Sequence, residues 1–218
     1  MKLIRGEDRL YRSPLLEAET WLEHGFGTAA AAPEPGYLVL KQVHSCQVAE
    51  AGEWREGLEA DGLITDRPGE KVGVKTADCV PVLLADPVRR AVAAVHAGWR
   101  GTVAEIAGAA VQEMKRRYGT RAEDLVAALG PSIGPCCFEV GREVGEQFRH
   151  FFPEWGEMTP RRVDLREANR RVLAGAGVRQ ERIGAEAPCT FCRAEEFHSW
   201  RRDRQAGRRM YSVIGIKI

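Results

Sequence analysis

Two apolar runs joined by a short polar segment constrain the fold of this chain more than any other feature. The first run lies within residues 76–87 and the second within residues 91–101, and each is long enough for a β-strand. The segment 86–90 between them has Pro87 at a place where turns favour proline. The pattern predicts an antiparallel β-hairpin.

A reactive side chain stands at each outer end of this predicted hairpin. Cys79 opens the first run and His96 closes the second. Pairing Asp86 with Arg89 places Cys79 opposite His96, at the roughly 4.5–5.5 Å that separates facing residues. That distance suits a shared metal ion or a thiolate–imidazole pair. A one-residue slip in register would turn one of the two side chains to the other face.

Charge and hydropathy limit the partners of the chain. It has 218 residues, and 32 Lys and Arg against 31 Asp and Glu give a net charge of +1. No global field therefore favours nucleic acid or a membrane surface. The first residues lack the apolar core of a signal peptide, and no run reaches the ~20 apolar residues of a membrane span. We expect a cytoplasmic monomer or homodimer whose six cysteines are reduced, which favours metal or catalytic roles over disulfides.

The remaining pattern mixes strands and helices without strict alternation, which favours an α+β fold. We predict further strands at 37–45, 61–65, 71–75, 125–129 and 210–218. Thr102 and Glu105 match a capping box, so a helix is predicted over 103–118 with Gly119 as its end. Two further helices are predicted, one over 140–151 before Pro153, and one that begins at Asp164 and ends at Gly177.

Four other cysteines and a proline-rich loop have less specific patterns. A single CxxC, Cys189 to Cys192, without a second pair is a weak zinc signal, and Cys136 and Cys137 are simply adjacent. We interpret these four as core or incidental cysteines. The loop 130–135 contains two glycines and two prolines, so it is either a plain tight turn or a backbone site for an oxyanion.

Three residues, His44, Cys79 and His96, form a candidate metal site. Two imidazoles and one thiolate suit a transition metal, and zinc with three protein ligands keeps a fourth position open for chemistry. Copper binds the same ligands, so donor type alone leaves the metal open, with zinc favoured.

Six motifs occur in an order that resembles the laccase-domain family, once called multicopper polyphenol oxidoreductases. Its members are described as purine nucleoside phosphorylases with adenosine deaminase activity. The resemblance runs from about residue 37 to the C-terminus. The motifs are KQVHS (41–45), ADG (60–62), TADCVPV (76–82), HAGWRG (96–101), LGPSIG (129–134) and SWRRD (199–203).

This resemblance implies zinc held by His44, Cys79 and His96. It implies phosphorolysis of adenosine, inosine and methylthioadenosine, together with hydrolytic deamination of adenosine. It also implies one laccase-like domain over 1–218, with mixed sheets sandwiched between helices in four layers (α/β/β/α), related to toxin deamidases that use Cys and His. Trp200 stands where Tyr or His is commoner, which leaves the fine substrate contacts open.

Four charged residues are the candidates for substrate chemistry. Phosphorolysis passes through an oxocarbenium-like transition state, so the enzyme must place phosphate and stabilise the leaving base. Charge and position indicate Arg201 and Arg202, or Arg100 beside the predicted helix, as binders of phosphate. Zinc nucleobase deaminases move the proton with a Glu. No Glu adjoins Cys79 or His96, so Asp78 is the nearest stand-in.

Three other classes of function compete with this hypothesis. Without metal, Cys79 and His96 would form the nucleophile and base of a cysteine hydrolase or deamidase. A copper-dependent polyphenol oxidase needs several copper centres, and the chain has five histidines. A non-catalytic binding protein has no need for His, Cys and His at the ends of neighbouring strands.

Overall fold

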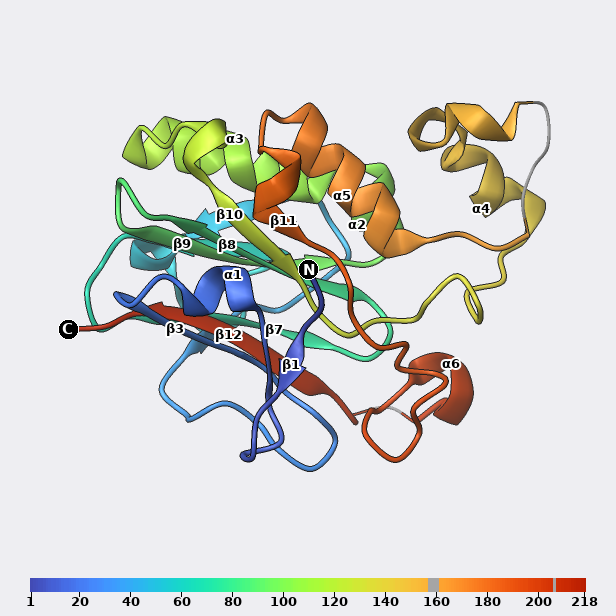
Figure 1. Cartoon of the computed structure of the whole chain (residues 1–218), viewed down its shortest axis with the longest axis horizontal. Helices are drawn as coiled ribbons and strands as arrows, with labels where there is room; N and C mark the ends of the chain where they lie inside the picture. Colours follow the sequence, from blue (N-terminus) through green and yellow to red (C-terminus); the bar gives the residue numbers. More distant parts are fainter. Residues whose placement is uncertain (157–160, 206) are drawn as a thin grey trace.

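The computed structural model describes residues 1–156, 161–205 and 207–218. Two six-stranded mixed sheets lie one on the other (Figure 1). Sheet I has the order β11-β10-β8-β9-β6-β5, and sheet II has the order β1-β2-β3-β12-β7-β4. The strands of sheet I are β5 (Val48–Glu50), β6 (Gly62–Thr65), β8 (Val80–Asp86), β9 (Ala91–Ala97), β10 (Val126–Leu129) and β11 (Ile183–Gly184). Those of sheet II are β1 (Ile4–Arg5), β2 (Tyr11–Arg12), β3 (Leu22–Phe26), β4 (Leu38–Val39), β7 (Lys71–Thr76) and β12 (Met210–Ile216).

Six α-helices connect these strands in the described residues. Only α3 and α5 are longer than two turns, with 13 and 11 residues. The helices are α1 (Pro14–Glu17), α2 (Trp99–Val103), α3 (Ile106–Tyr118), α4 (Arg142–Gln147), α5 (Leu165–Gly175) and α6 (Trp200–Asp203). No helix in this part of the chain is long and apolar enough to cross a membrane.

The predicted hairpin is confirmed as β8 and β9, the two central strands of sheet I. Every residue of both strands is buried. Helices α3 and α5 cover one face of the sheet and sheet II covers the other, so both sides of each strand meet apolar neighbours. That double burial explains why the two runs are continuously apolar rather than alternating.

The register of the hairpin differs from the predicted one by two residues. Asp86 pairs with Ala91 rather than Arg89, and Pro81 lies opposite His96. The turn holds four residues because Asp86 Oδ1 accepts hydrogen bonds from the backbone N–H groups of Val88 (2.9 Å) and Arg89 (3.0 Å). Side chains alternate with a period of two, so the shift moves Cys79 along the strand without sending it to the opposite face.

Apolar side chains fill two separate layers of core. One lies between sheet I and the long helices, where Met114 and Leu173 are fully buried. The other lies between the two sheets and includes Phe26, Leu83 and Ile214. Because α3 and α5 both lie on sheet I, and Figure 1 shows connecting segments rather than a helix below sheet II, the described residues form three layers. The predicted second helical layer is not found among them.

The helix predicted over 103–118 is interrupted near its start. Helix α2 ends at Val103, Glu105 takes a left-handed conformation with φ of 57°, and α3 begins at Ile106. Thr102 lies inside α2, where its hydroxyl accepts a hydrogen bond from Asn169 Nδ2 at 2.9 Å, so the predicted capping box does not form. The predicted end is confirmed, because Gly119 caps α3 with φ of 70°.

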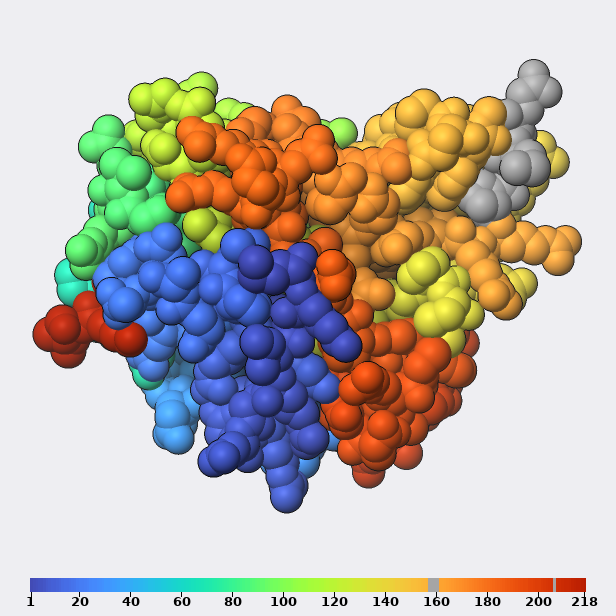
Figure 2. All heavy atoms as spheres, in the orientation of Figure 1, coloured from blue at the N-terminus to red at the C-terminus, as the bar shows by residue number. Residues whose placement is uncertain are grey.

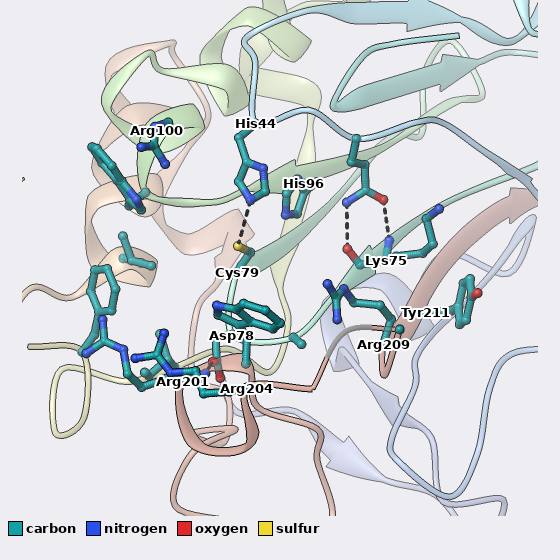
Figure 3. A pocket seen from close by; sticks show the side chains of 18 of the residues that line it. His44, Lys75, Asp78, Cys79, His96, Arg100, Arg201, Arg204, Arg209 and Tyr211 are labelled. Carbon is teal, nitrogen blue, oxygen red and sulfur yellow. Dashed lines mark hydrogen bonds between the residues drawn. The ribbon is translucent and has the colours of Figure 1, made fainter. Parts of the chain in front are cut away.

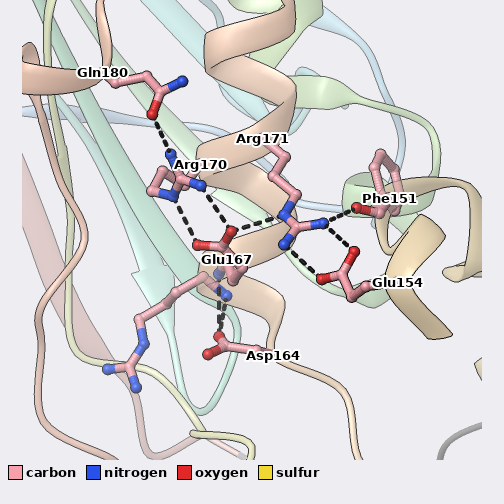
Figure 4. A network of polar contacts seen from close by, with 8 residues as sticks. Phe151, Glu154, Asp164, Glu167, Arg170, Arg171 and Gln180 are labelled. Atoms are coloured by element: carbon pink, nitrogen blue, oxygen red, sulfur yellow. Dashed lines mark hydrogen bonds and ion pairs between the residues drawn. The ribbon is translucent and has the colours of Figure 1, made fainter.

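Helix α5 begins as predicted and is anchored at its outer side by charged groups. Asp164 caps it by accepting hydrogen bonds from the N–H groups of Arg166 and Glu167. Arg171 donates to the Phe151 carbonyl at 2.6 Å and pairs with Glu154 (Figure 4). These contacts join α5 to the segment after α4. The helix predicted over 140–151 is shorter in the structure, at Arg142–Gln147, and a 3-10 turn at Arg149–Phe151 follows it.

Beside sheet II, segments that are far apart in the sequence contact one another at two places. The N-terminal residues and the region before α6 lie side by side (Figure 2), and the Tyr11 hydroxyl donates a hydrogen bond to Glu196. The run predicted as a strand over 37–45 pairs with β7 only at Leu38–Val39. Lys41 forms a single bridge with Glu59, and residues 42–45 then bend away to other partners. That bend carries His44 towards sheet I.

Candidate active site

The structure brings His44, Cys79 and His96 together from three segments. His44 lies in the loop after β4, Cys79 precedes β8, and His96 lies in β9. Their ligand atoms all lie within 4.8 Å of one another. Cys79 Sγ is 3.9 Å from His44 Nε2, and the two imidazole rings meet edge to face at 4.9 Å (Figure 3).

Asp61, which sequence reasoning did not place in the site, holds two of these residues. Its carboxylate is fully buried and accepts a hydrogen bond from His96 Nδ1 at 2.7 Å. The same carboxylate accepts the backbone N–H groups of Val43 (3.2 Å), His44 (3.0 Å) and Ser45 (2.7 Å). The ADG motif was the sequence signal for this role of Asp61, because a carboxylate at the start of a buried strand needs hydrogen-bond partners.

The His44 loop is held in an uncommon backbone conformation. His44 has φ of 61°, in the left-handed region that side chains other than Gly seldom adopt. Gln42 fixes the loop on the other side, because its amide accepts from Lys75 N–H and donates to Lys75 C=O, each at 2.7 Å (Figure 3). Hydrogen bonds on both sides thus offset the cost of this conformation.

Gly98 leaves the space in which the three side chains meet. A Cβ atom at this position would lie 2.8 Å from His44 Cδ2 and 3.0 Å from Cys79 Sγ. The first contact is closer than a Cβ atom tolerates and the second is tight, so any other residue where β9 runs into α2 would displace His44 or Cys79. This accounts for the first glycine of the HAGWRG motif.

The electrostatics of the site favour a thiolate. Burial opposes ionisation of Cys79, but the charge of His96 and hydrogen bonds from both histidines outweigh it and lower the pKa of the thiol to about 6. Burial also disfavours the imidazolium form of His96, but Cys79 and Asp61 raise its pKa to about 9. In the protein alone, the pair is therefore a thiolate beside an imidazolium ion near neutral pH.

A cavity of about 930 Å³ opens in front of these three residues. Its walls combine aromatic rings with basic side chains (Figure 3). The aromatic residues are Trp99, Phe138, Trp200 and Tyr211, and the basic ones are Lys41, Lys75, Arg100, Arg201, Arg204 and Arg209. Asp78 is the one acidic residue among those that line it. A cavity of this size and charge suits a small anion such as phosphate together with a ligand that contains a flat ring.

Asp78 lines the cavity, but its carboxylate already has partners. Oδ1 accepts from the Thr190 hydroxyl at 2.6 Å. Oδ2 accepts from the Ser199 hydroxyl at 3.0 Å and from Arg201 N–H at 2.7 Å. Its backbone has φ of 85°, directly before Cys79. These contacts favour a positioning role at the turn that presents Cys79, and the predicted proton transfer by Asp78 stays a prediction.

The three arginines predicted to bind phosphate lie in two different settings. Arg100 and Arg201 line the cavity, and each guanidinium lies over an aromatic ring, 4.3 Å from Trp99 and 5.4 Å from Phe138. Arg202 is not among the lining residues. Its guanidinium donates to the carbonyls of Thr190 (2.9 Å), Phe191 (3.0 Å) and Phe197 (2.8 Å), and these contacts favour a structural role.

Sequence reasoning did not select Lys75, Arg204 or Arg209 for the site. Lys75 lies in β7, whereas Arg204 and Arg209 lie between α6 and β12. All three belong to sheet II or its connections, and only the stacking of the two sheets brings them to a site built on sheet I. Arg204 ends the Arg-rich run 201–204, whereas no local motif marks Lys75 or Arg209.

The donor set fits a metal ion. A thiolate and two imidazoles are the ligands that zinc and copper prefer. A carboxylate holds Nδ1 of His96, as is common for histidines that bind metal through the other nitrogen. The cavity in front leaves room for a further ligand. The fold and this site together define an α+β protein with a His–Cys–His centre that could hold a metal ion beside a cavity.

Comparisons with known proteins identify the family. Residues 24–217 match the family described as multi-copper polyphenol oxidoreductase laccase. The chain is 39% identical over 210 residues to a purine nucleoside phosphorylase of Deinococcus radiodurans, which covers 93% of this chain and 78% of the relative. It is 41% identical over 182 residues to adenosine deaminase RL5 from an unknown prokaryotic organism, which covers 76% of this chain and 69% of the relative.

A solved structure agrees with these matches. The crystal structure of YlmD from Geobacillus stearothermophilus superposes with a TM-score of 0.85 at 27% identity, over 99% of both chains. The chain therefore belongs to the multi-copper polyphenol oxidoreductase laccase family, and the resemblance found in its motifs is confirmed.

Proposed function

We propose that this chain, as one domain over 1–218, is a zinc-dependent purine nucleoside phosphorylase that also deaminates adenosine. The observation that carries the proposal is the convergence of His44, Cys79 and His96 at a cavity of about 930 Å³ with basic and aromatic walls. The names of the relatives support both activities. The substrates are adenosine, inosine and methylthioadenosine, with phosphate as the second substrate of phosphorolysis.

His44, Cys79 and His96 would hold the zinc ion. Bound there, zinc supplies a Lewis acid and lowers the pKa of a water molecule towards neutrality. Asp61 fixes the tautomer of His96. Its hydrogen bond keeps the proton of the imidazole on Nδ1 and leaves Nε2 for the metal. Copper fits the same ligands, so metal analysis must accompany the assay.

The walls of the cavity position the two substrates. Trp200, with 43% of its surface exposed, offers a flat face on which a purine stacks. Arg100 and Arg201 provide guanidinium groups for phosphate, and Arg204 and Arg209 add positive charge from the neighbouring segment. Placing phosphate next to the ribose is the main requirement for a reaction whose transition state has oxocarbenium character.

A product assay tests this function. Zinc-loaded protein is incubated with adenosine, with and without phosphate, and the bases and nucleosides are separated by chromatography. We expect adenine only with phosphate and inosine under both conditions, and neither product from Cys79→Ala. Cys46→Ser, which changes an exposed cysteine outside the site, is the matched control. Absence of both products from the zinc-loaded parent protein would contradict the proposal.

A second candidate function is a metal-free cysteine hydrolase or deamidase of the toxin-deamidase type. The lowered pKa of Cys79 beside the imidazolium of His96 favours it, because the thiolate is the nucleophile in such enzymes. Zinc would suppress this chemistry. Alkylation of Cys79 at equal rates with and without a chelator would support the hydrolase, and protection by zinc would support the phosphorylase.

Copper-dependent oxidation of phenols, the reaction in the family's description, is a further alternative. Within residues 1–156, 161–205 and 207–218, His44 and His96 are the histidines that belong to a group able to bind metal. A blue-copper absorption band in the protein as purified, with oxygen uptake in the presence of a phenol, would favour this alternative.

A further inference from the structure

Four cysteines outside the candidate active site form a second cluster. Cys136 and Cys137 follow the loop after β10, and Cys189 and Cys192 lie on a turn before α6. All four sulfur atoms lie within 4.8 Å of one another, although more than 50 residues separate the two pairs. All four are free thiols. The interpretation of these residues as incidental does not account for this convergence.

The spacing of the sulfur atoms matches a tetrahedral thiolate site. Cys192 Sγ lies 3.6 Å from Cys136 Sγ and 3.3 Å from Cys137 Sγ. A zinc ion bonded to four sulfurs at ~2.3 Å requires sulfur atoms about 3.8 Å apart. A disulfide requires ~2.05 Å, far shorter than either separation. The cluster therefore has nearly the dimensions of a metal-binding tetrahedron and not those of a bonded pair.

The groups beside Cys189 suit negatively charged sulfur. The backbone N–H of Gly134 points at Cys189 Sγ at 3.2 Å. The Arg166 guanidinium holds the same turn by donating to the Pro188 carbonyl at 3.3 Å, and it lies beside Gly134. Four thiolates and one Zn²⁺ carry a net charge of −2, which a backbone donor and a nearby guanidinium stabilise.

The same two loops hold the turn that presents Cys79. Thr190, inside the CxxC turn, donates its hydroxyl to Asp78 and its backbone N–H to the Ser132 carbonyl at 3.0 Å. The N–H of Ile133, in the other loop, donates to the Asp78 carbonyl at 2.9 Å. A bond between the two loops would therefore fix Asp78 from both sides.

We propose that Cys136, Cys137, Cys189 and Cys192 bind one Zn²⁺ ion in a structural four-thiolate site, separate from the His–Cys–His centre. Binding displaces the four thiol protons to solvent and leaves four Zn–S bonds. With all four positions taken by protein, the ion has no open site for a substrate. Its role is to tie loop 130–137 to turn 189–192 and so to position Asp78.

Metal analysis of single-site variants tests this proposal without any activity measurement. Cys79→Ser removes a ligand of the other site and leaves the four-cysteine cluster intact. After loading with zinc and gel filtration, we expect Cys79→Ser to keep one equivalent. The double variant Cys136→Ser/Cys192→Ser should lose that equivalent, whereas Cys46→Ser should match the parent protein.

Cobalt substitution in the Cys79→Ser protein identifies the ligands. Four thiolates around tetrahedral Co²⁺ give intense visible bands and strong sulfur-to-metal charge transfer. We expect this spectrum, with bound metal protecting the four thiols from a thiol reagent. Absence of metal from Cys79→Ser, iron in place of zinc, or a missing thiol pair that reappears on reduction would each overturn the proposal. These readouts come from soluble Cys79→Ser, so misfolding of the double variant cannot hide the answer.

Discussion

Cys79 and Cys189 each belong to a cluster of side chains that could bind a metal ion, but the two clusters differ in their ligands and in what lies in front of them. Cys79 meets two imidazoles, one of which is oriented by the buried Asp61, and a large cavity lies in front of it. Cys189 meets three other thiols and the N–H of Gly134. Mixed ligands with an open side are typical of catalytic metal sites, and four sulfurs with none are typical of structural ones.

The difference teaches that one framework carries two clusters for which we propose different roles, catalysis for the first and stability for the second. Asp78 connects them, because it precedes Cys79 in the chain and accepts a hydrogen bond from Thr190 within the CxxC turn. Changes in the first cluster should therefore remove activity and spare the fold. Changes in the second should first remove stability.

The largest expected effect is on activity in Cys79→Ser. We expect kcat/KM for phosphorolysis to fall at least about a thousandfold, because a Lewis acid contributes several kcal/mol to transition-state stabilisation. The urea midpoint should change little. Steady-state kinetics and urea unfolding measure the two effects, with Cys46→Ser as control. A large loss of stability with activity retained would reverse the assignment of the two clusters.

The next effect is on stability in Cys136→Ser/Cys192→Ser. Loss of a structural metal belongs to the changes that cost about 4 kcal/mol or more in the free energy of unfolding. A strong zinc chelator should produce the same loss in the parent protein and no further loss in the double variant. Equal sensitivity of both proteins to the chelator would show that the stabilising metal lies elsewhere.

Asp61→Asn tests the oriented histidine that distinguishes the first cluster. We expect zinc affinity at the His–Cys–His site to fall about 10–100-fold, the usual effect of losing an outer-shell partner. Competition with a chromophoric chelator measures this in the double cysteine variant, where one site remains. Asp66→Asn, an exposed carboxylate nearby, is the control. An unchanged affinity in Asp61→Asn would remove Asp61 from the site.

Arg201 and Arg202 provide a contrast between neighbouring residues. Arg201→Ala should raise the KM for phosphate about tenfold, roughly 1.4 kcal/mol, and should change stability less than Arg202→Ala, because the Arg201 guanidinium donates to one carbonyl, that of Glu139, at 2.8 Å. Arg202→Ala should instead lower stability, because its guanidinium holds three carbonyls. Phosphate titrations and urea unfolding separate the two. An increase in the KM for phosphate in Arg202→Ala without loss of stability would return Arg202 to the substrate site.

The smallest expected effect concerns His24, a buried histidine whose pKa is lowered, whereas the pKa of His96 is raised. Burial, helped by Arg12, lowers the pKa of His24 to about 4, and its Nε2 accepts the N–H of Ser13 at 2.9 Å. The unfolded chain takes up a proton near pH 6.5, so the stability from neutral His24 is complete above that pH and is lost as pH falls towards 4. Between pH 8 and pH 6 the loss is about 0.8 kcal/mol.

His24→Gln tests this pH dependence, because the amide oxygen still accepts from Ser13 but does not titrate. We expect the stability difference between pH 8 and pH 6 to shrink in the variant relative to the parent protein. Urea unfolding at both pH values provides the measurement. Equal pH dependence in the two proteins would mean that the imidazole of His24 is not neutral in the folded state.

Local patterns predicted the parts of the fold that depend on neighbouring residues. The double apolar run predicted β8 and β9, Gly119 ended α3, and Asp164 capped α5. The capping box at Thr102 failed because a tertiary partner, Asn169, bonds its hydroxyl instead. The length of the hairpin turn was also predicted wrongly. Asp86 stabilises a four-residue turn, which shifts the register of β8 and β9 by two residues.

The sequence by itself determined the central hairpin, and the parity of its side chains kept Cys79 and His96 on one face despite the shifted register. Only the tertiary structure decided that Asp61 orients His96, that Arg209 reaches the cavity, and that Cys136 meets Cys192. The physical reason is distance along the chain. Contacts within a turn follow from residue spacing, whereas contacts between residues 17 to 56 positions apart depend on which strands pair within sheet I and on how the two sheets stack.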